Sequence, residues 1–208
     1  MGWAALFRRP PILRGVSASH IRADHAVNHA RIAGIELLCS AQEGKNQTKM
    51  TNEEILGVTV LNSWKIVINR FTKTISEFSD EQLQQQAAPG RNRVFYLVGH
   101  VIAMNDRMFP LLGLGDRLHP ELDQTYIANP DRALGDPLSA TDLRRAWSEV
   151  NNKLTTAFGG FTFEDWVQKH TAVSDEDFVK DPTRNRLAVV ISRTSHASYH
   201  SGQAILAK

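Results

Sequence analysis

Apolar side chains recur at steps of three and four residues in two long stretches, and this spacing constrains the fold more than any other feature. The first series is Leu61, Trp64, Val67, Ile68, Phe71, Ile75 and Phe78. The second series is Leu143, Trp147, Val150, Leu154 and Phe158. Such spacing gathers the apolar side chains on one face of an α-helix. We therefore expect two amphipathic helices, each packed by that face.

Two further helices are predicted from their ends. One spans residues 92–109 and stops before Pro110, and the other begins after Pro182 and runs almost to the end of the chain. Strand signals are nearly absent, since no pair of alternating β-branched runs is joined by a tight-turn dipeptide. The sequence thus predicts an all-α fold, a four-helix bundle with long crossover loops at residues 114–137 and 162–184.

Charge divides the chain into two parts. The whole sequence carries +2, and residues 1–49 contain seven Lys/Arg and three Asp/Glu, net +4, which leaves net −2 for residues 50–208. We interpret residues 1–49 as a basic leader that is disordered or precedes the true start, with an Arg-rich targeting segment as the alternative. Residues 50–208 are expected to form a single domain.

Composition excludes several classes of protein. The sequence has no run of about 20 apolar residues, so no membrane span is expected. Its mildly acidic folded part lacks the basic face that nucleic-acid binding needs. Cys39 is the single cysteine, which rules out an internal disulfide and a cysteine-rich zinc cluster. We therefore expect a cytoplasmic protein whose partner is a small molecule.

Three histidines form the candidate site. His196 and His200 stand four residues apart on the last predicted helix, about 40° apart around its axis, so both can reach one ion. His100 lies on the apolar face of the helix at residues 92–109 and is expected to point inward. Three neutral imidazoles from two helices would leave open positions for water or substrate, as in a catalytic metal site.

The helical position of the His196 and His200 pair leaves an ambiguity. The pair lies nearly opposite Leu187, Ile191 and Ile205 on the same helix. This helix must therefore be buried on two sides, or the pair faces outward as ordinary surface histidine.

Two motifs, in this order, carry a family resemblance. The run Leu97-Val98-Gly99-His100 and the run Ser195-His196-Ala197-Ser198-Tyr199-His200-Ser201-Gly202-Gln203 resemble the DinB-like (YfiT-like) superfamily over residues 50–208. The resemblance implies a four-helix bundle, often a homodimer, with a three-histidine site for zinc, nickel or a similar divalent metal ion. It assigns the three ligands to His100, His196 and His200. Phe95-Tyr96 departs from the tryptophan or serine-rich entry to the second helix in many relatives, which affects the pocket wall.

The resemblance also implies the chemistry. Relatives include thiol-dependent S-transferases that use low-molecular-weight thiols and metal-dependent hydrolases, and a metal ion on three imidazoles suits either reaction. The alternative is a non-catalytic metal-binding stress-response bundle. Candidate substrate-binding residues are Tyr96, Arg107 and Arg193, whose hydroxyl and guanidinium groups can meet an anionic thiol or substrate. Asp106 is the carboxylate nearest to His100 in sequence, and its helical position points it elsewhere.

Overall fold

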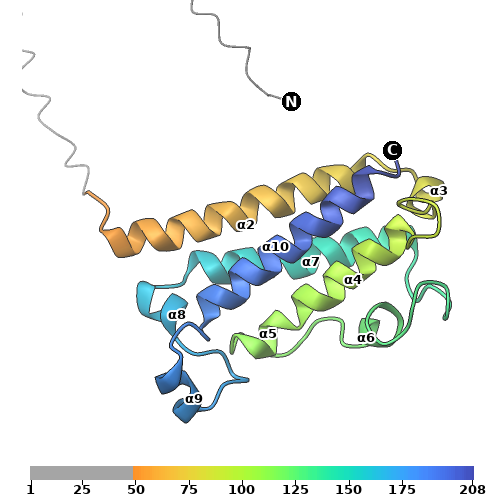
Figure 1. Ribbon diagram of the computed structural model, residues 1–208. Coiled ribbons are helices and arrows are strands. Elements are labelled where there is room, and N and C mark those ends of the chain that lie inside the picture. The colour runs from red at the N-terminus through yellow and green to blue at the C-terminus, as the bar shows by residue number, and fades with distance from the viewer. Residues whose placement is uncertain (1–48) are drawn as a thin grey trace, which may run out of the picture. The chain divides into compact units, whose positions relative to one another are not determined.

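The computed structural model describes residues 49–208, which contain helices α2 to α10 and no β-strand (Figure 1). The long helices are α2 (Asn52–Ser76), α4 (Val94–Asp106), α7 (Ala140–Gly159) and α10 (Arg186–Ile205). The all-α bundle predicted from the sequence is confirmed. The predicted basic leader, apart from Lys49, lies outside the described residues.

The starts of α2, α7 and α10 follow from local side-chain hydrogen bonds. Thr51 precedes α2 and forms a capping box with Glu54, in which each side chain bonds the other residue's backbone N–H. Ser139 caps α7, and Asn185 caps α10 by accepting from the backbone N–H of Ala188 at 2.9 Å. These caps satisfy backbone donors that a helix N-terminus leaves unpaired.

The four long helices pack around the bundle in the order α2, α10, α4 and α7. Figure 1 shows that α2 and α10 run in one direction and that α4 and α7 run in the other. Because α4 and α7 are parallel neighbours, the chain between them must return along the whole bundle. The long crossover predicted at residues 114–137 makes this return.

Aromatic side chains fill the core on the α2 and α7 side. Trp64 meets Phe158 edge-on with ring centroids 5.3 Å apart, and Phe71 meets Trp147 at 4.8 Å. The indole N–H of the buried Trp64 donates to the hydroxyl of Thr155 at 2.9 Å. Large rings thus contribute apolar burial without leaving this polar group unpaired.

Five short helices join the four long ones. They are α3 (Asp80–Leu83), α5 (Met108–Leu111), α6 (Leu122–Tyr126), α8 (Phe163–Val167) and α9 (Asp175–Lys180). The helix predicted over residues 92–109 ends at Asp106, and Pro110 lies in the first turn of α5, where a missing N–H costs nothing. The crossover, predicted as irregular, contains α6, which packs on α4 and buries Leu122 and Tyr126. Such short helices depend on tertiary packing, which periodicity does not report.

None of the helices in residues 49–208 is long and apolar enough to cross a membrane.

Candidate metal centre

The orientation of α10 resolves the ambiguity in the sequence. Its buried side chains are small or medium in size: Val190, Ala197, Ser201 and Ala204. Of the apolar residues opposite the histidine pair, Ile191 and Ile205 are 48% and 45% exposed, and Leu187 is partly buried against the core. The pair therefore lies beside the packed face, and the larger isoleucines face outward. Small side chains allow α10 to approach α2 and α4 closely, which brings the histidines next to α4.

Gly99 allows α6 to pack beside the third histidine. A Cβ atom at Gly99 would lie 2.6 Å from the Tyr126 ring, closer than real Cβ atoms come to their neighbours. The fully buried Tyr126 ring thus occupies the space that any other residue would fill. In this position the backbone carbonyl oxygen of Tyr126 accepts a hydrogen bond from His100 Nδ1 at 2.8 Å. The glycine of the first motif therefore supports the histidine that follows it.

The three imidazoles converge through the same ring atom. His196 Nε2 lies 3.2 Å from His100 Nε2 and 3.1 Å from His200 Nε2. Two imidazoles bound tetrahedrally to one zinc ion at about 2.0 to 2.1 Å would place their nitrogens about 3.3 Å apart. All three ligand atoms lie within 4.8 Å of one another. This geometry fits one divalent cation shared by α4 and α10.

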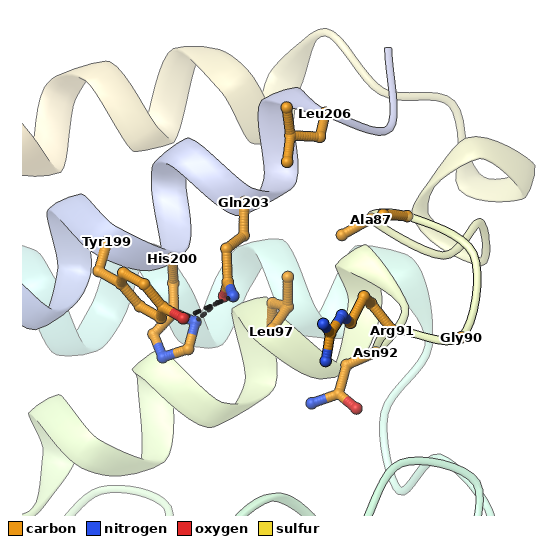
Figure 2. A pocket seen from close by; sticks show the side chains of 10 residues that line it. Ala87, Gly90, Arg91, Asn92, Leu97, Tyr199, His200, Gln203 and Leu206 are labelled. Atoms are coloured by element: carbon orange, nitrogen blue, oxygen red, sulfur yellow. Dashed lines mark hydrogen bonds between the residues drawn. The ribbon is translucent and has the colours of Figure 1, made fainter.

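Hydrogen bonds at the opposite ring atom fix two of the three tautomers. A carbonyl oxygen only accepts, so His100 Nδ1 carries the proton that reaches Tyr126. His200 Nδ1 donates to Gln203 Oε1 at 2.7 Å, and the Gln203 amide donates to the Tyr199 hydroxyl at 3.0 Å (Figure 2). Both rings therefore turn an Nε2 lone pair toward the centre. Such partners orient metal-ligating histidines and raise their basicity.

Burial keeps two of the three histidines, His196 and His200, uncharged. Burial lowers the pKa of His196 to about 4, with further lowering by His200, His100 and Arg193. Burial also lowers the pKa of His200, although its hydrogen bond to Gln203 opposes the shift. Neutral imidazole is the form that binds a metal ion, so no proton has to leave these two rings near neutral pH.

The comparisons agree with this architecture. Residues 63–204 match the sequence model of the DinB superfamily. The chain belongs to the DinB superfamily. A crystal structure of a conserved protein from Enterococcus faecalis is similar, with a TM-score of 0.51 and 16% sequence identity over 76% of this chain and 96% of that chain. At this identity the likeness supports the fold alone. A search among curated proteins gives no significant match.

Two of the predicted substrate-binding residues of this DinB-superfamily chain are engaged within the protein. Tyr96 is buried, stacks beside the His100 ring, and donates its hydroxyl to the carbonyl oxygen of Asn129 at 2.7 Å. Arg107 follows α4 and pairs with Asp123 at 2.7 Å. These contacts favour positioning roles. A substrate contact by either residue stays a prediction.

Arg193, the third predicted substrate-binding residue, differs from these two. Its guanidinium is half-buried one turn before His196, and among residues 49–208 no carboxylate lies within ion-pair distance of it. Burial and the nearby Arg107 charge lower its pKa. A cation without a counter-ion attracts an anion. The Arg193 guanidinium lies close enough to His196 to lower the pKa of that histidine.

Sequence reasoning missed the groups that hold the histidines. Gln203 had a usable signal, since it stands three residues after His200 on the same helix and so faces the same side. Tyr126 had no such signal, because it binds His100 through its backbone carbonyl and lies on a crossover helix, 26 residues further along the chain. Backbone acceptors carry no residue signature.

Proposed function

We propose that this protein is a metal-dependent thiol S-transferase for small molecules, with a zinc, nickel or similar divalent ion held by His100, His196 and His200. The observation that carries the proposal is the convergence of three Nε2 atoms, two of them with lone pairs directed by hydrogen bonds at Nδ1. A divalent cation in such a site supplies Lewis acidity, which lowers the pKa of a coordinated thiol or water.

The lack of a free carboxylate on α4 and α10, the two helices that carry the histidines, favours thiol transfer over hydrolysis. A metal-dependent hydrolase generally uses a nearby carboxylate as general base. Helix α10 contains no Asp or Glu, and α4 contains only Asp106. Asp106 is fully buried and accepts hydrogen bonds from Arg117 and from the backbone N–H groups of Leu118 and His119. It is therefore engaged as a structural acceptor. A thiol needs no such base once its pKa is lowered.

The proposed transfer is a displacement at carbon. The S–H bond of the thiol breaks, and its proton passes to solvent. The sulfur then forms a bond to the electrophilic carbon of the second reactant, and the leaving group departs with the electron pair of the broken bond. In this reaction Arg193 attracts the anionic sulfur reactant to the His196 side of the cluster, because its charge lacks a carboxylate partner among the described residues.

Metal content tests the first half of the proposal. The full chain is loaded with zinc or nickel, desalted and analysed by inductively coupled plasma mass spectrometry. We expect one ion per chain in the wild type and near-complete loss in His100→Ala and His196→Ala. The control is His119→Ala, since His119 lies outside the cluster beside Glu149 and should leave the stoichiometry unchanged. Equal metal content in wild type and His100→Ala would refute the site.

Turnover tests the second half. The metal-loaded chain is assayed with monobromobimane and a panel of low-molecular-weight thiols, and the product is followed by fluorescence. We expect thiol-dependent product formation that His196→Ala abolishes and that Arg193→Gln reduces through a higher KM for anionic thiols. Full metal occupancy without turnover of any thiol would favour the non-catalytic metal-binding bundle instead.

We also propose that the protein is a homodimer. Ile55, Val58 and Ile66 are exposed and spaced to share one side of α2, and Ile191 and Ile205 are exposed on its neighbour α10. Apolar side chains gathered on the surface of neighbouring helices are typical of subunit contacts. Light scattering coupled to size-exclusion chromatography measures the mass that decides between one chain and two.

A further inference from the structure

A cavity of about 370 Å³ lies beside His200, between the C-terminal half of α10 and the loop that joins α3 to α4 (Figure 2). This volume falls within the range of small-molecule pockets, roughly 300 to 1,000 Å³. Tyr199, His200 and Gln203 line it from α10, and Leu97 of α4 lies between the two walls. The cavity therefore opens onto one of the three histidines.

The loop that forms the opposite wall is held in place by its own hydrogen bonds. The backbone N–H of Ala87 donates to the carbonyl of Asn92 at 3.0 Å, and that of Arg91 donates to Ala88 at 2.9 Å. Gly90 provides the left-handed turn, with φ at +73°. This backbone holds Arg91 and Asn92 at the cavity before any ligand arrives, which lowers the ordering cost of binding.

Arg93 anchors the base of this loop. Its guanidinium is nearly buried and pairs with Asp131 at 2.6 Å and with Asp136 at 2.8 Å. Its backbone N–H also donates to Asp131 at 2.7 Å. The two carboxylates are thus occupied by Arg93, and the neighbouring Arg91 is left without them.

The two polar side chains that the loop presents to the cavity have no internal partners among the described residues. Neither the Arg91 guanidinium nor the Asn92 carboxamide makes a side-chain hydrogen bond or ion pair within residues 49–208. Figure 2 shows the Arg91 side chain extending from the loop toward the Gln203 side of the cavity. A guanidinium presents two parallel N–H donors that match a carboxylate, and a carboxamide N–H adds a third. Leu97 and Leu206 offer apolar surface beside them.

We propose that this pocket binds a small organic carboxylic acid, with its carboxylate on Arg91 and Asn92, its apolar body against Leu97 and Leu206, and its far end at His200. The inference deepens the proposed function, on which it rests for one step: the acid is one of the two reactants of the thiol transfer. The carboxylate belongs either to the thiol or to the electrophile, and both share the same recognition chemistry.

Binding without turnover tests the pocket by itself. Hexanoate and the uncharged hexanamide are each titrated into the full chain, once in its metal-free and once in its metal-loaded form. Binding is followed by NMR chemical-shift changes. We expect hexanoate to bind at least tenfold more tightly than hexanamide, and Arg91→Gln to weaken hexanoate about tenfold, as loss of a charge-assisted hydrogen bond predicts. Arg91→Lys should restore part of the loss, because it keeps the charge but not the paired donors.

The matched control is Arg70→Gln, which removes an exposed arginine on α2 outside the pocket. It should bind hexanoate as the wild type does. Equal affinity for hexanoate and hexanamide, or an equal effect of the Arg91 and Arg70 substitutions, would overturn the proposal. Circular dichroism verifies that both variants retain the helical fold, which substitutions of two exposed side chains should leave intact.

Turnover then distinguishes the two sources of the carboxylate. In one arm, 3-mercaptopropionate is compared with 3-mercaptopropionamide, with monobromobimane as the electrophile. In the other, iodoacetate is compared with iodoacetamide, with 2-mercaptoethanol as the thiol. In one of the two arms, Arg91→Gln should raise the KM of the acid but not that of the matching amide, and that arm identifies the reactant that uses the pocket. Turnover that does not depend on Arg91 in either arm contradicts a role of the pocket in the reaction. Carboxylate binding without any turnover would leave the pocket intact and refute the transferase.

Discussion

Replacing Gly99 with alanine tests the link between helix packing and the proposed metal centre. The new Cβ would lie 2.6 Å from the Tyr126 ring, and ordinary contacts begin near 3.4 Å. The ring must therefore move by the difference, about 0.8 Å, or α4 and α6 must separate. Because Tyr126 is fully buried, its ring has no solvent-filled space to enter. We expect the change to reach the backbone carbonyl that holds His100.

Two opposing terms set the size of the effect on stability. Overpacking a well-filled core costs about 1 to 3 kcal/mol. Replacing glycine with alanine inside a helix raises the free energy of unfolding by roughly 0.8 to 1 kcal/mol, because alanine has the higher helix propensity. With a ring that cannot retreat, the cost should lie in the upper part of its range, and the net loss in free energy of unfolding should be about 1 to 2 kcal/mol. The displaced hydrogen bond to His100 should also weaken metal binding about 10- to 100-fold.

Urea denaturation of the metal-free chain measures the first effect, and competition with a chromogenic chelator at fixed pH measures the second. Gly202→Ala is the control on α10, since nothing lies within 4 Å of the added Cβ there. It should raise stability by up to about 1 kcal/mol and leave metal affinity unchanged. In a Tyr126→Leu background the penalty of Gly99→Ala should largely disappear. A Gly99→Ala variant as stable as Gly202→Ala would refute the reasoning.

Three further outcomes follow from other contacts. Asn151→Ala removes the acceptor of the buried Asn105 amide and should lower the free energy of unfolding by about 1 to 3 kcal/mol in urea denaturation. Arg117 holds the pKa of Asp123 below its usual range, so this pair stabilises the fold above the unfolded pKa of about 3.9 and loses that contribution as pH falls through the lower folded pKa. Wild type and Asp123→Asn should therefore differ in thermal stability at neutral pH and converge in acid, and an unchanged gap at pH 2 would contradict the pairing. Ile66→Glu places a charge on the exposed apolar side of α2 and should shift the mass measured by light scattering from two chains to one, whereas an unaltered mass would remove α2 from the contact.

The long helices were predictable because the sequence signals for a helix, apolar periodicity and capping residues, are local. The series from Leu61 to Phe78 and from Leu143 to Phe158 follows one helix face, and a side chain on such a face is buried in almost any bundle. His100 was placed inward for the same reason, since α4 is buried over nearly its whole length. Capping residues then define where α2, α7 and α10 begin.

The orientation of α10 was not predictable, because both of its faces carry apolar residues. Ile191 and Ile205 have more apolar surface to bury than Ala197 and Ala204, and hydrophobicity alone favours burying the isoleucines. The structure buries the alanines instead, because small side chains let α10 approach two neighbouring helices at once. The choice depends on the shape of the partner surfaces, which no segment of the sequence carries by itself.

The sequence by itself therefore determined the four long helices, the residue types of the cluster and the resemblance that the DinB superfamily match confirms. Only the tertiary structure brought His100 to within 3.2 Å of His196, 96 residues further along the chain. Only the tertiary structure set the Tyr126 carbonyl behind His100 and the Arg91 loop across from His200. Periodicity reports which face of a segment is apolar. Contacts between distant segments arise from packing, which depends on all the segments together.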